Sequence, residues 1–379
     1  MKISFLLLFF ITTATALACQ QSRYKPMARQ NIDDANRLGI DEELSREIFA
    51  LPISGFSGVM LEMPKGASLK SGDGDSIYVA PYYIDATEVC NAHYRAFVEW
   101  NARVFESLPQ VVQNMMPDTA IWLRLFPNEE IGELLQKQYF RNPAFDYYPV
   151  VGISWQQAQA YAFWRSDRIN EAILIDGEKL FADTESQLGE YHFSTINYLQ
   201  GLYEGTPGRK PMRSPITGEE RRVRATDNIL LPYYRLPTAA ELEYAAAQPQ
   251  QFEKNKEFAA FKKKITAHNK QYRLPAYYDH NRYNLPRPII EETASNAPHH
   301  LNSNVDEWTQ QNYRTSEQYN MHYARFDEKG NLSAIHVPIW YRQAIGLMDT
   351  SIVNNLHQQH SIKNSSPYKG FRCVMPNMW

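Results

Sequence analysis

The chain has 379 residues, with 39 Lys and Arg, 42 Asp and Glu, and 44% hydrophobic residues. This composition excludes a wholly disordered protein and leaves room for one large or two ordinary domains. The formal charge of −3 provides no long-range basic field, so we expect no nucleic-acid partner. Three cysteines without CxxC spacing exclude a disulfide scaffold and a structural zinc site.

The first eighteen residues have the pattern of a secretory signal peptide. Lys2 is followed by an unbroken apolar run from Phe5 to Ile11, and small residues lead to Cys19. The run is too short to span a bilayer permanently. Two interpretations of Cys19 stay open: ordinary signal-peptidase cleavage nearby, or lipidation of its thiol, as the lipobox of bacterial lipoproteins implies. We expect lipidation, because a cysteine directly after such a run is otherwise uncommon.

These features divide the chain into three parts. We predict a signal peptide at residues 1–18, a polar lipidated tether at 19–50 and a body at 51–379. No later apolar run approaches bilayer length, so we expect the protein to be held at the membrane by lipid alone.

In chain order, the body begins with a strand and a helix. The aromatic and β-branched run Tyr82–Ile84 predicts a strand, and a helix is predicted from Asn91 to about Phe105. Residues 108–148 show no strong periodicity and are interpreted as an insert. The β-branched run Val150–Ile153 predicts a second strand.

Two capping boxes predict the next helices. In a capping box, a Ser or Thr and a Glu or Gln three residues later each accept a side-chain hydrogen bond from the other residue's backbone amide. Ser154 with Gln157 opens one helix, whose apolar residues fall near one face while Arg165, Asp167 and Arg168 lie elsewhere. That helix should pack on a core.

The second capping box lies between two further inserts, at 174–232 and 249–298. Thr238 with Glu241 opens a helix that runs to Ala247 and stops before a proline. The run Phe371–Val374 predicts a closing strand.

Five separated segments together resemble the formylglycine-generating-enzyme, or sulfatase-modifying factor, family. They read YIDATEVCNAHY at 83–94, PVVGISW at 149–155, YRLPTAAELEYAA at 234–246, NVDEWT at 304–309 and GFRCV at 370–374. The resemblance implies an α+β class, with an irregular fold related to C-type lectins and carrying long inserts. Arg235 and Arg372 within these segments are predicted to be buried structural cations that pair with acids such as Glu88, Glu241 or Glu243.

The resemblance also suggests an oxidase activity, which the sequence does not favour. The family's oxidase holds copper through two cysteines shortly before the GFRC segment, because thiolates suit Cu(I). Residues 334–369 contain no cysteine, and His336, His357 and His360 are more typical of a polar surface loop than of a metal site. We therefore expect an inactive member of an enzyme-like fold and assign no catalytic residue.

Calcium is the only cofactor that the resemblance leaves as a candidate. Glu307 matches the family's acidic ligand, and Asp306 or Asn304 would add oxygen atoms. Ser303 and Val305 could still offer carbonyls, but three positions depart from the family pattern: His300 replaces a side-chain oxygen, Ser303 the glycine and Asp306 the first Trp.

The two other cysteines, Cys90 and Cys373, leave two alternatives open. An exported protein meets an oxidising compartment, where thiols within reach usually pair, and the resemblance places their neighbouring strands in one sheet. Two buried, inert thiols are the other alternative.

Segments outside the five motifs look like the gliding-motility lipoproteins GldJ and GldK, at residues 117–122, 139–152, 164–171 and 192–199. Those proteins are outer-membrane lipoproteins on the periplasmic side, associated with gliding and type IX secretion. The expected function is a non-catalytic scaffold whose partners are other subunits of that machinery. A divergent oxidase and a calcium-dependent ligand-binding module are the alternatives.

Overall fold

The computed structural model describes most of the body. The described residues are 59–63, 67–70, 76–214, 216–223, 227, 229, 231–248, 255–290, 304–310, 325–326, 332–334 and 365–376. Cys19, the predicted signal peptide and the predicted tether lie outside the described residues, as do His300, Ser303, His336, His357 and His360.

The central sheet joins the two ends of the body. Strand β4 (Tyr82–Asp85) lies between β1 (Met60–Met63) and β11 (Val374–Pro376), and both neighbours run antiparallel to it. Ile84 is the register partner of Leu61 on one side and of Val374 on the other. The predicted strand at 82–84 is confirmed.

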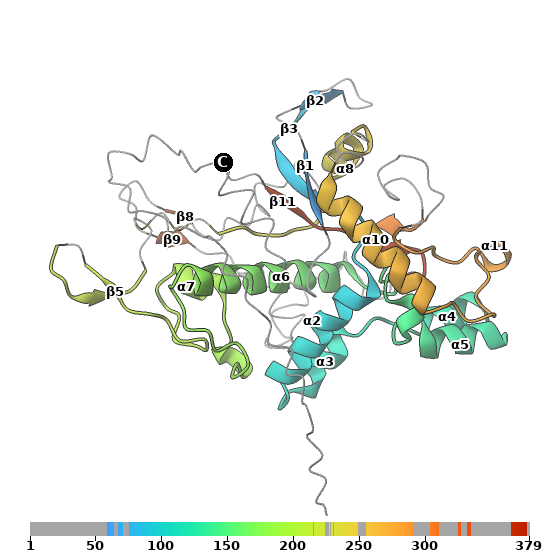
Figure 1. Cartoon of the computed structure of the whole chain (residues 1–379), viewed down its shortest axis with the longest axis horizontal. Coiled ribbons are helices and arrows are strands. Elements are labelled where there is room, and N and C mark those ends of the chain that lie inside the picture. The colour runs from blue at the N-terminus through green and yellow to red at the C-terminus, as the bar shows by residue number, and fades with distance from the viewer. Residues whose placement is uncertain are drawn as a thin grey trace, which may run out of the picture.

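Three predicted helices are confirmed. They are α2 (Asn91–Val104), α6 (Trp155–Asp176) and α8 (Ala239–Ala246). Both predicted capping boxes are formed: Ser154 caps α6 and Thr238 caps α8. Figure 1 shows α6 crossing the middle of the molecule, with β1 and β11 above it and α2 and α3 below.

The predicted strand at 150–153 is wrong. Gly152 has a φ of 74°, which interrupts an extended chain, and a Cβ there would lie 2.7 Å from the carbonyl oxygen of Asp118. The amides bond to irregular neighbours instead, Val150 to the Val89 carbonyl and Gly152 to the Ser366 carbonyl. The close backbone contact, not the β-branched composition, determines this segment.

The closing segment is only partly a strand. Val374 belongs to β11, whereas Phe371 and Cys373 lie before it. Their carbonyls still accept from the amides of Val89 and Asp85, at 2.8 and 2.9 Å. The segment therefore follows the path of β4 even where it is irregular.

The segments interpreted as inserts contain helices that periodicity did not indicate. Residues 108–148 hold α3 (Pro109–Met115), α4 (Ile121–Leu125), α5 (Glu130–Gln138) and the short η2 (Pro143–Phe145). The middle segment holds η3 (Gly189–Tyr191), α7 (Thr195–Leu199) and the hairpin of β5 (Met212–Arg213) with β6 (Glu220–Arg221). The last holds α10 (Lys256–Gln271) and α11 (His280–Tyr283).

The remaining strands are short pairs. β2 (Ala67–Lys70) pairs with β3 (Ser76–Val79), β7 (Asp306–Glu307) runs parallel to β10 (Lys369–Gly370), and β8 (Arg325–Phe326) pairs with β9 (Leu332–Ala334). The mixture of helices with small sheets confirms the predicted α+β class. Within the described ranges, no helix is long and apolar enough to cross a membrane.

The core lies on both faces of the central sheet. One cluster includes Tyr83, Tyr161, Trp164 and Cys373. The other includes Ile84 and Val374, which follow Tyr83 and Cys373 in the chain and lie on the opposite face of the sheet. A third cluster joins α4 and α5 to the loop before α11. The first segment interpreted as an insert therefore contributes its own apolar core, which fixes α4 and α5 relative to the body.

Candidate functional site

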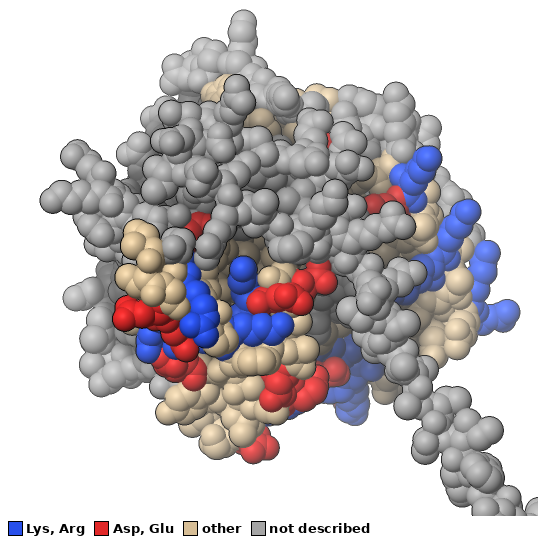
Figure 2. All heavy atoms as spheres, turned by 60° about the vertical axis from the view of Figure 1, so that its left-hand side comes forward, with Lys and Arg blue, Asp and Glu red and all other residues tan. Residues whose placement is uncertain are grey.

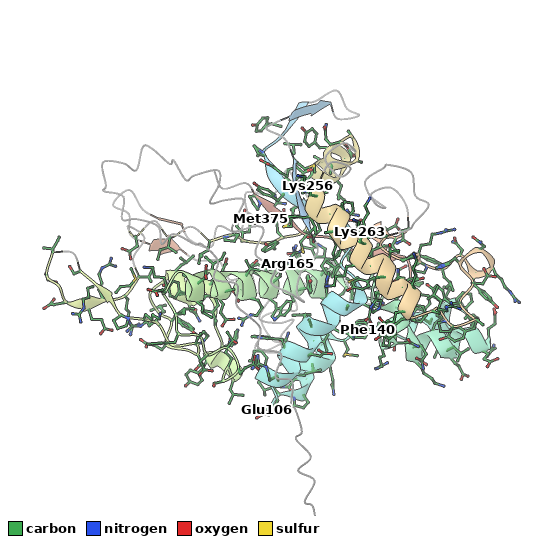
Figure 3. All side chains as sticks on the ribbon, in the orientation of Figure 1. Glu106, Phe140, Arg165, Lys256, Lys263 and Met375 are labelled. Atoms are coloured by element: carbon green, nitrogen blue, oxygen red, sulfur yellow. The ribbon has the colours of Figure 1, made fainter. Side chains whose placement is uncertain are left out.

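Ion pairs are buried where β4 meets α6 and the GFRC segment. Arg165 on α6 donates to both carboxylate oxygens of Asp85, at 2.7 and 2.9 Å, and both residues are fully enclosed. The guanidinium also lies 4.2 Å from the Tyr234 ring, and Asp85 accepts the Cys373 amide at 2.9 Å. Figure 3 shows Arg165 on α6 and Met375 on the closing strand. The pair ties α6 to the sheet.

A second arginine, Arg372, confirms the prediction of a buried structural cation. Its Nε and Nη2 donate to the Glu307 carboxylate at 2.7–2.9 Å, and its Nη1 donates to the Asp85 carbonyl at 3.0 Å. The charged partner is Glu307, which the prediction had not named, although Glu88 lies close enough to affect the same group. Arg235 pairs with Glu241, as predicted, at 2.6 and 2.8 Å.

Glu88 is the buried acid next to this second pair. Burial raises the pKa of Glu88 to about 8, the nearby Arg372 lowers it, and the Glu307 carboxylate raises it. Its Oε1 accepts from the side-chain amide of Asn304 at 3.1 Å, and its Oε2 is buried with no hydrogen-bond partner among the described residues. A protonated Glu88 at neutral pH explains how an acid is tolerated beside a second carboxylate.

The candidate calcium ligands do not form a shared set of oxygen atoms. Both Glu307 oxygens accept from Arg372. The Asn304 side-chain oxygen accepts from the Arg287 amide at 2.7 Å, and Asp306 is exposed with its backbone in β7. The described part of the chain contains no group of three His, Cys, Asp or Glu residues that could hold a metal ion. These residues therefore do not fit a calcium ion in this arrangement.

Cys90 and Cys373 are both buried free thiols, so the alternative disulfide is not formed in the structure. Cys90 packs in the cluster with Ile84 and Val374, whereas Cys373 packs in the cluster on the other face of the sheet. Burial raises the pKa of Cys90 to about 12 and raises that of Cys373 as well. Both thiols are therefore protonated and out of reach of solvent at neutral pH.

The segment before GFRC, where the family places its chemistry, is described only at its end. The Ser365 hydroxyl donates to the Asp118 carboxylate at 2.8 Å, and the Ser366 carbonyl accepts the Gly152 amide at 3.0 Å. This end of the segment is held against the first insert and the 149–155 motif.

Three of the arginines between residues 209 and 223 form ion pairs with nearby acids. Arg209 pairs with Glu220, Arg221 pairs with Asp227, and Arg222 pairs with Glu204. Figure 2 shows acidic and basic side chains interspersed on the face that comes forward, the side on which β5 lies in Figure 1. An anion site is not indicated there.

Sequence reasoning missed the Asp85–Arg165 pair. Arg165, Asp167 and Arg168 were predicted to lie away from the apolar face of α6, yet all three are buried. Arg168 donates to Glu171 at 2.7 Å and lies 4.3 Å from the Trp100 ring. The helix is enclosed on nearly every side, so its polar residues form internal pairs, and a one-face pattern could not reveal this.

The family of the chain follows from its sequence profile. The profile of the sulfatase-modifying factor enzyme 1-like domain matches residues 62–376. The chain belongs to the sulfatase-modifying factor family. This match confirms the family to which the five motifs pointed.

Other comparisons add little to the family assignment. The comparison with curated proteins finds no match. Among solved structures, a crystal structure of CarF is similar at 18% identity, over 84% of this chain and 98% of that chain, with a TM-score of 0.30. A TM-score this low carries no argument about this protein.

Proposed function

We propose that the protein is a non-catalytic, lipid-anchored scaffold of the gliding-motility and type IX secretion machinery, on the periplasmic side of the outer membrane. The observation that carries the proposal concerns its thiols. The whole chain has three cysteines: Cys19 follows the predicted signal peptide, and Cys90 and Cys373 are fully buried. The body therefore offers no accessible thiol to a metal ion or a substrate.

The lack of an accessible thiol argues against the alternative function, a divergent oxidase. Copper chemistry of the family's kind needs two thiolates that share one ion. Cys90 and Cys373 lie in different core clusters, and burial raises the pKa of each, which disfavours thiolate formation. The proposal also includes no resident calcium, because Glu307 is already bound by Arg372.

The large inserts support a scaffold role. Their helices are anchored by the third apolar cluster and by hydrogen bonds such as Arg95 to the Phe140 carbonyl and His268 to the Pro143 carbonyl. Surfaces that are fixed in this way are suited to docking partners. Resemblance to the lipoproteins GldJ and GldK suggests which machinery supplies them, with Cys19 providing the membrane anchor.

Turnover of a sulfatase-type cysteine peptide tests the non-catalytic part of the proposal. The purified full chain, supplied with copper and a reductant, should convert no substrate to the aldehyde product within the detection limit. An active family member assayed in parallel is the positive control. Steady product formation by this chain, unchanged after metal-affinity removal of contaminating enzymes, would refute the proposal and favour the oxidase.

A further inference from the structure

Helix α10 carries an excess of positive charge. It contains five lysines and one acid, in a chain whose formal charge is −3. Its buried side chains are Phe258 and Ile265, which hold it against the body. Lys256 and Lys263 are exposed, and neither forms an ion pair within the described part of the chain.

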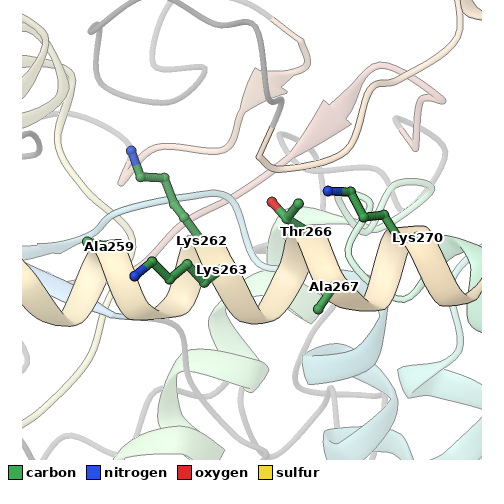
Figure 4. Close-up of a pocket in the computed structure, with 6 residues that line it drawn as sticks. All are labelled: Ala259, Lys262, Lys263, Thr266, Ala267 and Lys270. Carbon is green, nitrogen blue, oxygen red and sulfur yellow. The ribbon is translucent and has the colours of Figure 1, made fainter.

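The lysines border a depression on one side of the helix. Residues four apart in a helix share a side, and Lys262 and Lys270 lie on either side of Thr266 (Figure 4). The depression has a volume of ≈ 470 Å³, and the small side chains of Ala259, Thr266 and Ala267 also line it. Figure 3 shows Lys256 and Lys263 on the same helix. The helix thus presents a shallow trough with a cationic rim.

A second depression continues the first beyond the end of the helix. The two share Thr266 and Lys270, and the second has a volume of ≈ 450 Å³. Its lining includes Tyr148, Leu274 and Ile290, which are apolar or aromatic, and its rim includes the exposed Arg273. Together they form one groove, here called the α10 groove, which is basic along its length and apolar at its end.

We propose that the α10 groove binds an acidic segment of a partner protein, with one apolar side chain of that segment inserted at the Leu274–Ile290 end. A groove with a basic rim matches acidic side chains, and its concave apolar end requires a side chain of complementary shape. A flat anionic membrane would meet the lysines but could not fill that end. This binding role rests on the proposed scaffold function and gives the chemistry of one partner.

A direct binding experiment on the full chain in detergent tests this. The probe is a fluorescein-labelled peptide of three Glu-Glu-Phe-Leu repeats, followed by fluorescence anisotropy. We expect saturable binding that weakens as salt rises, and a loss of about tenfold or more in affinity in the triple reversal Lys263→Glu, Lys270→Glu, Arg273→Glu. The matched control reverses Lys210 and Arg213 on the β5 side of the molecule, and its affinity should stay within about twofold of the original.

A second variant separates shape from charge. Thr266→Trp fills the point where the two depressions join without changing any charge, and it should also weaken the peptide by about fivefold or more. Phosphatidylglycerol vesicles are the competing probe. Equal peptide affinity in all variants would overturn the inference. A second combination of results would also overturn it: the charge reversals abolish binding to the vesicles, while Thr266→Trp leaves peptide binding unchanged. Failure of the peptide while secretion subunits still co-purify would refute the groove alone and leave the scaffold proposal standing.

Discussion

At the residue scale, the buried pair of Asp85 and Arg165 joins the sheet to α6. We expect Arg165→Met to destabilise the protein by about 3–5 kcal/mol, because Asp85 would remain buried without its cation. The double variant Asp85→Asn, Arg165→Met should recover part of that loss, since it leaves no uncompensated charge. Urea unfolding followed by circular dichroism measures both. If Arg165→Met stays within about 0.5 kcal/mol of the original, the buried pair does not stabilise the fold.

The raised pKa of Glu88 predicts how the stability of the protein depends on pH. Its pKa lies near its ordinary value of 4.5 in the unfolded chain and at about 8 in the folded protein. Between these values the folded state binds more protons, so this group lowers stability as pH rises from about 4.5 to 8, and the penalty is complete above that range.

Removing that acid should remove the penalty. We expect Glu88→Gln to be more stable than the original protein at pH 8.5, by on the order of 1–3 kcal/mol, and nearly equal to it at pH 4.5. Thermal melts across that range measure the difference. Glu62 on β1, which is exposed, provides the control when changed to Gln. A constant difference between the two proteins at all pH values would show that Glu88 is not protonated by burial.

At the element scale, the capping box of α6 fixes where that helix begins. Ser154 accepts the Gln157 amide at 3.2 Å, and Gln157 accepts the Ser154 amide at 2.8 Å. Ser154→Ala should lower the free energy of unfolding by about 1 kcal/mol, whereas Ser186→Ala on an exposed loop should have a smaller effect. Equal losses in denaturant titrations of the two variants would mean that the cap does not stabilise α6.

The same element shows what the sequence could reveal. Capping boxes and the first strand are local patterns, so α6, α8 and β4 were predicted with correct starts. Helix α10 was missed because it buries only Phe258 and Ile265, too few apolar residues to give a periodic signal. Residues 150–153 were misassigned because their conformation depends on a long-range backbone contact.

The residues of the candidate site were likewise predicted only in part from the sequence. Arg235 and Arg372 were predicted as buried cations from the motif that contains each one. The partnership of Arg372 with Glu307, and that of Arg165 with Asp85, joins segments far apart in the chain, which only the fold brings together. The lack of a shared ligand set at Asn304 and Glu307 follows from these pairings.

At the scale of the whole molecule, the membrane anchor is expected to be Cys19. If acyl chains on this residue hold the protein, Cys19→Ser should move it from the outer-membrane fraction to the soluble periplasmic fraction. Cys90→Ser changes a thiol that is buried in the body and is the matched control. Fractionation with immunoblotting measures the distribution. Full retention of the Cys19 variant at the outer membrane would show that protein contacts provide the attachment.

The proposed role of the protein is to hold partners and not to carry out chemistry. Affinity purification of the full chain from detergent-solubilised membranes, with quantitative mass spectrometry of the bound proteins, tests it most directly. We expect subunits of the secretion and gliding machinery to be recovered in fixed ratios to this chain and to be absent from a control purification of an unrelated outer-membrane lipoprotein. Recovery of the chain without any of those subunits, under conditions that keep the machinery intact, would contradict it.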